Sequence, residues 1–455
     1  MTETRRIQGM RAFLTIWAGQ AVSLLGSSLT NFALGVWVYQ RTGSVTKFAL
    51  IAFFASLPGL LISPVAGALV DRWDRRRTLI LSDSMAAVMS VVLLVLLWDE
   101  SRNLLEIWHI YVLTAFASVA NALQWPAFTA ATTLLVPKHH YGRASGLSQM
   151  GLALSQILAP FLGALMLQWV RMRGILIVDL ATFGFAVLVL LAVRFREPER
   201  LPETGAPRSL WQDSTVGWTY LRQRPGLLAL LILFAVTNFN IGMLQALLAP
   251  LILSFASSTS LGIVLSVAGI GMLAGTLILG IWGGPKRRIH GIFTGLLVQG
   301  LILLVGGWQP SVFLVGAAAF VFLFSVPFIN GCSQAIWQAK VPPGLQGRVF
   351  AVRRMVAMSS MPAAYFLAGP LADRVFEPML APGGALSGSV GAVIGVGQGR
   401  GIGFLFVLLG LLVVSVLAFA LTYPRLRQVE DELPDAMPDG AAPAASAVLE
   451  VQTSG

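Results

Sequence analysis

The sequence predicts an all-α polytopic membrane protein with twelve transmembrane helices in two six-helix pseudo-repeats. Of its 455 residues, 56% are hydrophobic and only 11% are charged, whereas soluble proteins carry about 25% charged residues. Apolar runs of the length that crosses a bilayer, about 20 residues, recur along almost the whole chain. A short sequence after the fourth run also recurs after the tenth. Together these observations exclude a soluble globular protein.

Twelve segments meet the length criterion. Each is predicted to be a helix, because backbone polar groups in hydrocarbon must be paired within the segment. The longest uncharged stretch, 225–285, has 61 residues, and a small polar patch at 254–260 divides it into two spans. The predicted spans are 12–39, 48–70, 79–98, 107–135, 144–170, 174–193, 227–254, 261–282, 289–307, 311–339, 349–371 and 402–423.

The positive charges predict the orientation. With the N-terminus in the cytoplasm, the inner segments hold 24 of the 31 Lys and Arg residues, and the outer loops hold 7. Cytoplasmic loops of membrane proteins carry this excess. We therefore expect a multi-pass membrane protein with both termini cytoplasmic. The net charge of +11 is then a topology signal and does not indicate a nucleic-acid partner.

An internal repeat predicts the domain organisation. Segments 136–143 and 341–348 both begin with Val-Pro and end with Gly-Arg, at a fixed offset of 205 residues. Two halves of the same orientation are typical of transporters that arose by duplication. The predicted units are an N-terminal half (1–194), a cytoplasmic linker (195–225), a C-terminal half (226–423) and a disordered cytoplasmic tail (424–455).

Three segments outside the spans have distinctive compositions. The linker can form a short helix at the membrane interface, although a plain linker remains an alternative. One face of that helix would carry Leu210, Trp211, Trp218 and Leu221. The Gly-rich outer loop 378–403 is expected to be disordered, with a lid or a re-entrant segment as alternatives. The tail after Tyr423 is acidic and rich in Ala and Pro, which is typical of disorder.

A dense charge cluster lies between spans 2 and 3. Residues 71–77 contain six charges in seven positions, on a link too short for a folded domain. Such a cluster can serve as a hinge, a latch or a topology anchor. The pattern Gly67-x-x-x-Asp71-Arg72-x-x-Arg75-Arg76 resembles the signature of the major facilitator superfamily between helices 2 and 3, and the resemblance covers roughly residues 12–423.

Two further patterns resemble the exporters of that superfamily. Small residues and a proline on span 5 fall in the register of the exporters' helix 5 motif, and they would let two helices approach closely. The run from Trp125-Pro126 to Val136-Pro137 resembles the bacterial branch that contains enterobactin and macrolide exporters. The helix 5 residues are Gly146, Ser155, Ala159, Pro160, Gly163 and Ala164.

The resemblance implies a role for the charge cluster as a conformational latch. The superfamily usually has Gly where this chain has Asp74, and Asp tolerates a left-handed turn better than most residues. Asp71 is expected at the N-terminus of span 11, where the helix dipole favours an anion. Asp83 is expected to pair with the basic cluster, roughly 9 Å from Arg77 along the helix. The latch residues are Gly67, Asp71, Arg72, Arg75, Arg76 and Asp83.

Asp179, inside span 6, is the candidate for proton coupling. Charged residues within a span are expensive, so each is a functional candidate. One interpretation makes Asp179 a structural partner of Arg171 or Arg173. The other makes it a protonatable group that couples export to proton entry. Proton-coupled drug exporters of the superfamily often carry an Arg in helix 4, and residues 117–124 contain none.

Amides and one aromatic residue are the candidates for the substrate cavity. The resemblance implies that helices 1, 4, 7 and 10 line it, which fits most of their positions. An apolar pocket with scattered amides suits a bulky, amphipathic, neutral or weakly charged ligand, although each amide could equally bridge two helices. The candidates are Gln20, Asn31, Asn121, Gln124, Trp125, Gln149, Gln156, Asn238, Asn240, Gln245, Asn330 and Gln334.

The sequence therefore predicts a secondary transporter, not an enzyme. Its four histidines are not spaced as a metal or catalytic set, Cys332 lies alone in an apolar run, and no phosphate-binding loop follows a strand. We expect a monomer in the bacterial inner membrane, in contact with lipid and without cofactor or metal. We expect it to export a drug such as a macrolide, or a siderophore or other secreted metabolite, by alternating access with proton antiport. An importer of the same fold and a transport-inactive receptor or assembly subunit remain alternatives.

Overall fold

The computed structural model describes residues 9–98, 104–137, 140–193 and 210–432. Within these residues it contains twelve helices of at least 19 residues and no strand. Eleven of them are long and apolar enough to cross a membrane by length and composition. The twelfth, α4, spans Ile107–Leu135 and carries several of the predicted cavity residues. The prediction of an all-α fold with twelve long helices in a membrane protein is confirmed.

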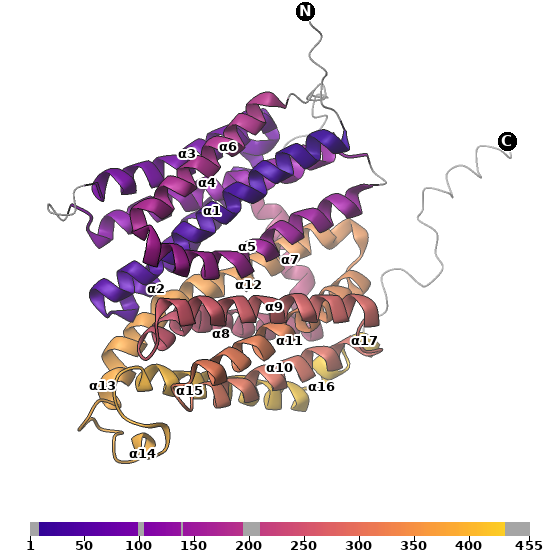
Figure 1. Cartoon of the computed structure of the whole chain (residues 1–455). Coiled ribbons are helices and arrows are strands. Elements are labelled where there is room, and N and C mark those ends of the chain that lie inside the picture. Colours follow the sequence, from indigo (N-terminus) through magenta and orange to yellow (C-terminus); the bar gives the residue numbers. More distant parts are fainter. Residues whose placement is uncertain (1–8, 99–103, 138–139, 194–209, 433–455) are drawn as a thin grey trace, which may run out of the picture.

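The first six long helices form one bundle and the last six form another (Figure 1). In the first bundle the other helices are α1 Met10–Thr42, α2 Val45–Arg72, α3 Arg75–Leu96, α5 Tyr141–Trp169 and α6 Arg171–Ala192. The second bundle contains α8 Pro225–Leu253, α9 Ser258–Trp282, α10 Arg288–Gly306, α11 Val312–Lys340, α12 Pro343–Pro370 and α15 Arg400–Thr422. The two bundles pack against each other through the pairs α5–α9 and α2–α12.

The two ends of the molecule differ in how the bundles meet. We call the end where α1 begins and α15 ends the linker end, and the opposite end the far end. At the far end one hydrophobic core joins both bundles, with Val36 and Val45 packed in the same cluster as Leu247 and Tyr365. At the linker end each bundle has a core of its own. The bundles are therefore held together mainly at the far end.

Polar contacts reinforce the closure of the far end. Asp373 lies in the π-helix η3, Leu371–Phe376, which continues α12. Its carboxylate accepts hydrogen bonds from Ser44 Oγ at 2.7 Å and from the backbone N–H groups of Val45 and Thr46, both at 2.9 Å. Asp373 thus caps the first turn of α2 in the other bundle, where the helix dipole favours an anion. Gly369 permits the contact, because a Cβ there would collide with Thr46.

The Gly-rich loop is ordered, contrary to the expectation of disorder for 378–403. It contains the short helices α13, Glu377–Met379, and α14, Val390–Ile394. Glu377 accepts hydrogen bonds from the N–H groups of Gly399 and Ile402, both at 3.0 Å, and so caps α15. The sequence suggested disorder because of its many glycines, several of which take positive φ angles in tight turns.

The predicted disordered tail also begins with ordered structure. Residues Pro424–Arg427 and Val429–Glu432 form the short helices α16 and α17, and the side chains of Leu426 and Val429 are buried under the second bundle. Composition alone missed this segment because its two buried apolar residues are embedded among charges. Residues 433–455 of the predicted tail lie outside the described residues.

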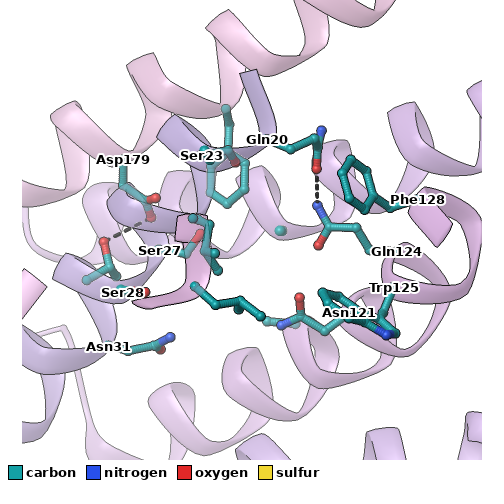
Figure 2. A pocket seen from close by; sticks show the side chains of 18 of the residues that line it. Gln20, Ser23, Ser27, Ser28, Asn31, Asn121, Gln124, Trp125, Phe128 and Asp179 are labelled. Carbon is teal, nitrogen blue, oxygen red and sulfur yellow. Dashed lines mark hydrogen bonds between the residues drawn. The ribbon is translucent and has the colours of Figure 1, made fainter. Parts of the chain in front are cut away.

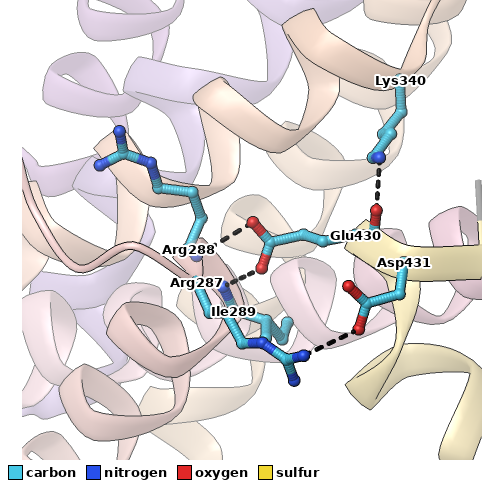
Figure 3. Close-up of polar contacts among 6 residues, drawn as sticks. All are labelled: Arg287, Arg288, Ile289, Lys340, Glu430 and Asp431. Atoms are coloured by element: carbon cyan, nitrogen blue, oxygen red, sulfur yellow. Dashed lines mark hydrogen bonds and ion pairs between the residues drawn. The ribbon is translucent and has the colours of Figure 1, made fainter. Parts of the chain in front are cut away.

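Glu430 of α17 fixes this segment to the bundle (Figure 3). Its carboxylate accepts hydrogen bonds from the N–H groups of Arg288 and Ile289, both at 3.0 Å. These groups belong to the first turn of α10, whose own N-cap is Arg287 and supplies no side-chain cap. Asp431 forms an ion pair of 3.3 Å with Arg287. The tail therefore supplies the cap that α10 lacks.

The linker contains a helix, as one of the two interpretations expected. Helix α7 spans Leu210–Arg222 and packs on α12. The close approach occurs at Gly217, where a Cβ would lie 2.7 Å from the carbonyl oxygen of Arg348. On the predicted apolar face, Leu221 is fully buried while Trp218 is 42% exposed.

Candidate substrate cavity

A cavity of about 210 Å³ lies inside the first bundle, between α1, α3, α4, α5 and α6 (Figure 2). Helix α1 forms one wall with residues that recur every three or four positions, which places them on one face of the helix. This wall is largely polar and uncharged. Its side chains include Trp17, Gln20, Ser23, Ser27, Ser28 and Asn31.

Helix α4 forms the facing wall. Asn121, Gln124, Trp125 and Phe128 follow the same helical spacing and point into the cavity (Figure 2). Of the twelve predicted cavity residues, the cavity therefore brings together five: two on α1 and three on α4.

Asp83 lies behind two of these amides and fixes them. It is fully buried, and its two oxygens accept hydrogen bonds from Gln20 Nε2 and Gln124 Nε2, both at 2.7 Å. Gln124 Nε2 also donates to Gln20 Oε1 at 2.8 Å (Figure 2). The expected pairing of Asp83 with the basic cluster is wrong. Asp83 lies on the buried face of α3, whereas Arg77 is exposed in the first turn.

Asp179 lies on the opposite side of the cavity from Gln124 (Figure 2). Only 2% of its surface is exposed. Oδ2 accepts hydrogen bonds from Thr30 Oγ1 at 2.9 Å and from Ser90 Oγ at 2.6 Å, while Oδ1 has no hydrogen-bond partner among the described residues. Gly26 makes room for this region of α6, because a Cβ there would collide with Thr182 Oγ1 and lie 3.0 Å from Asp179 Oδ1.

These contacts decide against one interpretation of Asp179. Its side-chain partners are hydroxyl groups of α1 and α3, so the expected pairing with Arg171 or Arg173 is wrong. Arg173 instead donates to the carbonyl oxygen of Leu97 at 2.8 Å, at the end of α3. Asp179 lies two turns into α6 and points to the interior of the bundle. Arg171 and Arg173 lie in the first turn of α6, at the end of the bundle.

The remaining predicted cavity residues lie elsewhere. Gln149 and Gln156 of α5 are exposed, because α5 turns Ser148, Gly151 and Leu152 toward the cavity instead. In the second bundle, the predicted residues do not line this cavity. Asn330 is exposed and Asn238 is half-buried. Tyr365 donates to Gln245 Oε1 at 2.6 Å, and Asn240 is buried, with Nδ2 donating to the carbonyl oxygen of Leu409 at 3.2 Å.

The last of the predicted amides, Gln334, reveals a cation that the sequence interpretation did not single out. Arg353 Nη1 donates to Gln334 Oε1 at 2.8 Å, and the guanidinium lies 5.0 Å from the ring centroid of Trp337. Arg353 is ten residues into α12. Its position inside the predicted span 349–371 was the signal that could have identified it.

The turn of the predicted latch differs from the expected one. Asp74 has φ −66° and is the N-cap of α3, and its Oδ1 accepts a hydrogen bond from the N–H of Arg77 at 2.7 Å. The expectation of a left-handed turn at this position is therefore wrong. Asp is among the preferred N-cap residues, which explains why this chain does not need Gly here. The side chains of Asp71 and Arg72, at the end of α2, lie outside the described residues.

The other latch residues are described. Arg76 Nε and Nη2 donate to the carbonyl oxygens of Leu190 and Leu191, at 2.6 and 2.7 Å. These carbonyl groups belong to the last turn of α6, so Arg76 caps a helix of its own bundle, where a cation complements the dipole. Gly67 lies in α2 with nothing within 4 Å of an added Cβ, and Arg75 is half-buried in the first turn of α3.

The helix 5 residues lie where α5 contacts two neighbours. Gly163 faces α1, where a Cβ would lie 2.8 Å from the ring of Phe32. Pro160 and Ala164 face α9, where a Cβ on Gly262 would lie 2.6 Å from the Pro160 carbonyl oxygen and 2.9 Å from Ala164 Cβ. Ser155 and Ala159 are buried, and Gly146 has nothing within 4 Å. The small residues therefore allow the close packing that their spacing predicted.

The described residues contain no group of three or more His, Cys, Asp or Glu side chains that could hold a metal ion. Cys332 is buried and unpaired.

Several characterised proteins are similar in sequence to this chain. The family model described as Major Facilitator Superfamily matches residues 16–365. Macrolide efflux protein A of Streptococcus pyogenes is 30% identical over 370 residues, covering 80% of this chain and 90% of that protein. The protein of the same name from Enterococcus faecalis is 29% identical over 325 residues, covering 70% and 98%. Multidrug efflux pump Tap of Mycobacterium tuberculosis is 26% identical over 375 residues, covering 80% and 87%.

Solved structures show the same fold at lower identity. A bacterial homologue of the human lysosomal transporter Spinster, in an inward-facing and unoccupied conformation, aligns with a TM-score of 0.71 at 14% identity, over 93% of this chain and 98% of that one. A mutant of the nucleoside transporter NupG aligns with a TM-score of 0.67 at 11% identity, over 90% and 98%. The resemblance to macrolide exporters is confirmed. This chain is a multi-pass membrane protein that belongs to the major facilitator superfamily.

Proposed function

We propose that the protein exports a hydrophobic or amphipathic small molecule from the bacterial cytoplasm by alternating access. The observation that carries this proposal is the cavity between α1 and α4, lined by aromatic side chains and amides. Such a lining suits a bulky apolar molecule with a few polar groups. The names of the relatives make a macrolide the first substrate to test, followed by a siderophore or another secreted metabolite.

The cores of the two bundles support alternating access. The bundles share a core at the far end and have separate cores at the linker end. Rocking of two rigid halves about a central site is the usual mechanism of this architecture. With the linker end in the cytoplasm, as the distribution of Lys and Arg predicts, the described conformation is closed toward the outside. In this proposal the protein works as a monomer in contact with membrane lipid.

Proton antiport is the proposed source of energy, with Asp179 as the coupling residue. A carboxylate inside a membrane bundle is costly when charged, and one oxygen of Asp179 lacks a hydrogen-bond partner among the described residues. Protonation would remove the charge. Proton binding and release at this group would therefore change the electrostatics of the cavity during each cycle.

Transport in inside-out membrane vesicles tests the proposal. We expect a radiolabelled macrolide to accumulate in vesicles when their interior is acidic, and the accumulation to collapse when the pH gradient is dissipated. Asp179→Asn should abolish the response to the gradient. Asp431→Asn, at an exposed ion pair, is the matched control and should transport normally.

The same assay addresses the alternatives. Uptake into right-side-out vesicles would identify an importer. Absence of transport for macrolides, siderophores and lipophilic cations, in a protein that inserts normally, would favour a receptor or assembly subunit. Efflux that ignores the imposed gradient in wild type and Asp179→Asn alike would refute proton coupling and leave export in place.

A further inference from the structure

We propose that the guanidinium of Arg353, in α12, binds an acidic group of the substrate and helps to determine specificity. This inference rests on the proposed function and narrows its substrate class to amphipathic molecules that carry a carboxylate or another organic anion. Among the substrates proposed above, it favours a secreted metabolite with an acidic group. Three features of Arg353 carry the inference: its uncompensated charge, its unused hydrogen-bond donors and its place in the internal repeat.

Arg353 has no carboxylate to balance its charge. The six long helices of the second bundle contain no Asp or Glu. Asp373, Glu377 and Glu430 lie at the ends of this bundle and cap helix N-termini. Arg353 forms no ion pair within the part of the chain that the structure describes. A charged side chain within a membrane span is costly, so a cation without a counter-ion is a functional candidate.

The guanidinium keeps donors that the protein does not use. It has five N–H donors, of which Nη1 donates to Gln334 Oε1 at 2.8 Å and Nη2 to Ser333 Oγ at 3.3 Å. The other N–H groups have no acceptor among the described residues. The guanidinium also lies over the rings of Trp337 and Phe234, 5.0 and 5.9 Å from their centroids. These contacts stabilise a cation without using an N–H group, so the remaining donors can bind a carboxylate.

The internal repeat relates Arg353 to the cavity of the first bundle. Helix α11 begins and ends 205 residues after α4, which is also the offset of the repeated segments that follow these two helices. At this offset Ser333 corresponds to Phe128 and Arg353 to Ser148, and both Phe128 and Ser148 line the cavity. Arg353 therefore occupies, in the second bundle, a position that forms part of the cavity wall in the first.

The guanidinium can be reached from the linker end. Arg353 lies ten residues into α12, about 15 Å from its start at 1.5 Å per residue. Helix α12 starts at the linker end, where α7 packs on it and where each bundle has a core of its own. The side chain of Arg353 is half-buried, so it lies at the edge of the core of the second bundle and is not sealed inside it.

Binding to the purified full-length protein tests the inference without any gradient. The probes are dansylglycine, which is an anion at neutral pH, and its amide, dansylglycinamide, which is neutral and otherwise similar. Dansyl fluorescence measures binding, with protein-free micelles as the blank. We expect wild type to bind the anion at least ~10-fold more tightly, the factor that one hydrogen bond to a charged group supports. Equal binding of the two probes, or binding of neither, would overturn the inference.

Variants separate this contact from a general effect of positive charge. Arg353→Gln should bind both probes equally, with its affinity for the neutral probe unchanged. Arg353→Lys keeps the charge without the planar fork of the guanidinium, so it should keep only part of the preference. Arg354→Gln, at the exposed neighbour on the same helix, is the matched control and should keep the whole preference.

Three results with these variants would overturn the inference. They are retention of the preference by Arg353→Gln, an equal loss of preference in Arg354→Gln, and an undiminished preference in Arg353→Lys. The Lys variant keeps the test decisive if Arg353→Gln fails to fold.

A chloride titration distinguishes an acidic substrate from an inorganic anion. Saturable displacement of dansylglycine by NaCl, absent with sodium methanesulfonate at equal ionic strength, would assign the guanidinium to chloride and overturn the inference. We expect equal, purely ionic-strength-dependent weakening by both salts. Failure of the binding preference leaves macrolide export in vesicles untouched. Conversely, loss of transport in vesicles refutes the proposed function while the binding preference can persist, so the two failures are distinguishable.

Discussion

Ser44 Oγ donates a hydrogen bond of 2.7 Å to Asp373, and this contact joins residues 329 positions apart in the two bundles. The same carboxylate accepts the N–H groups of Val45 and Thr46. A helix N-terminus of one bundle is thus capped by a carboxylate of the other. Because α2 and α12 pack along each other, opening of the far end must break this cap.

We expect Asp373→Ala to shift the protein toward a conformation open at the far end. Hydrogen bonds to charged groups contribute about 1.5–3 kcal/mol each, so loss of the cap should raise the open population by ~10-fold or more. The measurement is maleimide labelling of Ala49→Cys, in the shared far-end core, in a Cys332→Ser background. Unchanged labelling in Asp373→Ala would show that the apolar contacts alone keep this end closed.

Asp83 organises the cavity, and its contacts predict a stability effect. Asp83→Ala removes the charged acceptor of the half-buried amides of Gln20 and Gln124, and hydrogen bonds to charged groups contribute about 1.5–3 kcal/mol each. We expect a lower thermal unfolding midpoint in detergent. Arg77→Gln is the matched control, since Arg77 is exposed, and should unfold like wild type. Equal destabilisation by both variants would instead support the pairing of Asp83 with the basic cluster that the sequence predicted.

The sequence predicted the long helices because their signal is local. A run of about 20 apolar residues that crosses a membrane forms a helix, because only a helix pairs its backbone polar groups within the segment. The cavity residues of α1 and α4 were predicted from their residue types, together with the family resemblance, which implies that helices 1 and 4 line the cavity. That prediction named Gln20, Asn31, Asn121, Gln124 and Trp125, which all line the cavity.

The contacts that the sequence could not predict are those between distant helices. Asp83 was assigned to the nearest basic residues along its helix, whereas its partners lie on α1 and α4. Asp373 and Glu430 cap helices 327 and 141 positions away. The sequence does not show that Asp373 or Glu430 is a capping residue. A carboxylate that caps a helix N-terminus can come from any part of the chain. Composition also misassigned the Gly-rich loop, at the end of which Glu377 caps α15.

Glu430 should contribute to the stability of the second bundle. Glu430→Ala removes the acceptor for the first N–H groups of α10, and loss of a helix cap costs about 0.5–2 kcal/mol. We expect a lower unfolding midpoint in detergent. Asp431→Asn is the control, because its ion pair is more than half exposed and exposed pairs contribute about 0–1 kcal/mol. Equal midpoints for Glu430→Ala and wild type would mean that the buried contacts of Leu426 and Val429 hold α17 by themselves.

The contact between α5 and α9 predicts a steric effect on transport. A Cβ on Gly262 would lie 2.6 Å from the carbonyl oxygen of Pro160, so Gly262→Val must push the two helices apart. We expect normal insertion and strongly reduced transport, measured in vesicles at matched protein levels. Gly280→Val, where an added Cβ has nothing within 4 Å, is the control and should transport normally. Normal transport by Gly262→Val would show that α5 and α9 do not need to approach closely in any step of the cycle.

The charge cluster after α2 gives the last prediction, which separates a latch from a topology anchor. Asp71→Asn keeps the size of the side chain and every arginine of the cluster, so the topology signal is preserved. If Asp71 holds the linker end closed by capping α12, the variant should insert normally and transport slowly. Asp74→Asn is the matched control, because Asn is as good an N-cap as Asp and can keep the hydrogen bond from Arg77. Normal transport by both variants would leave the stretch from Gly67 to Arg77 as an anchor, and slow transport by Asp71→Asn alone would establish the latch.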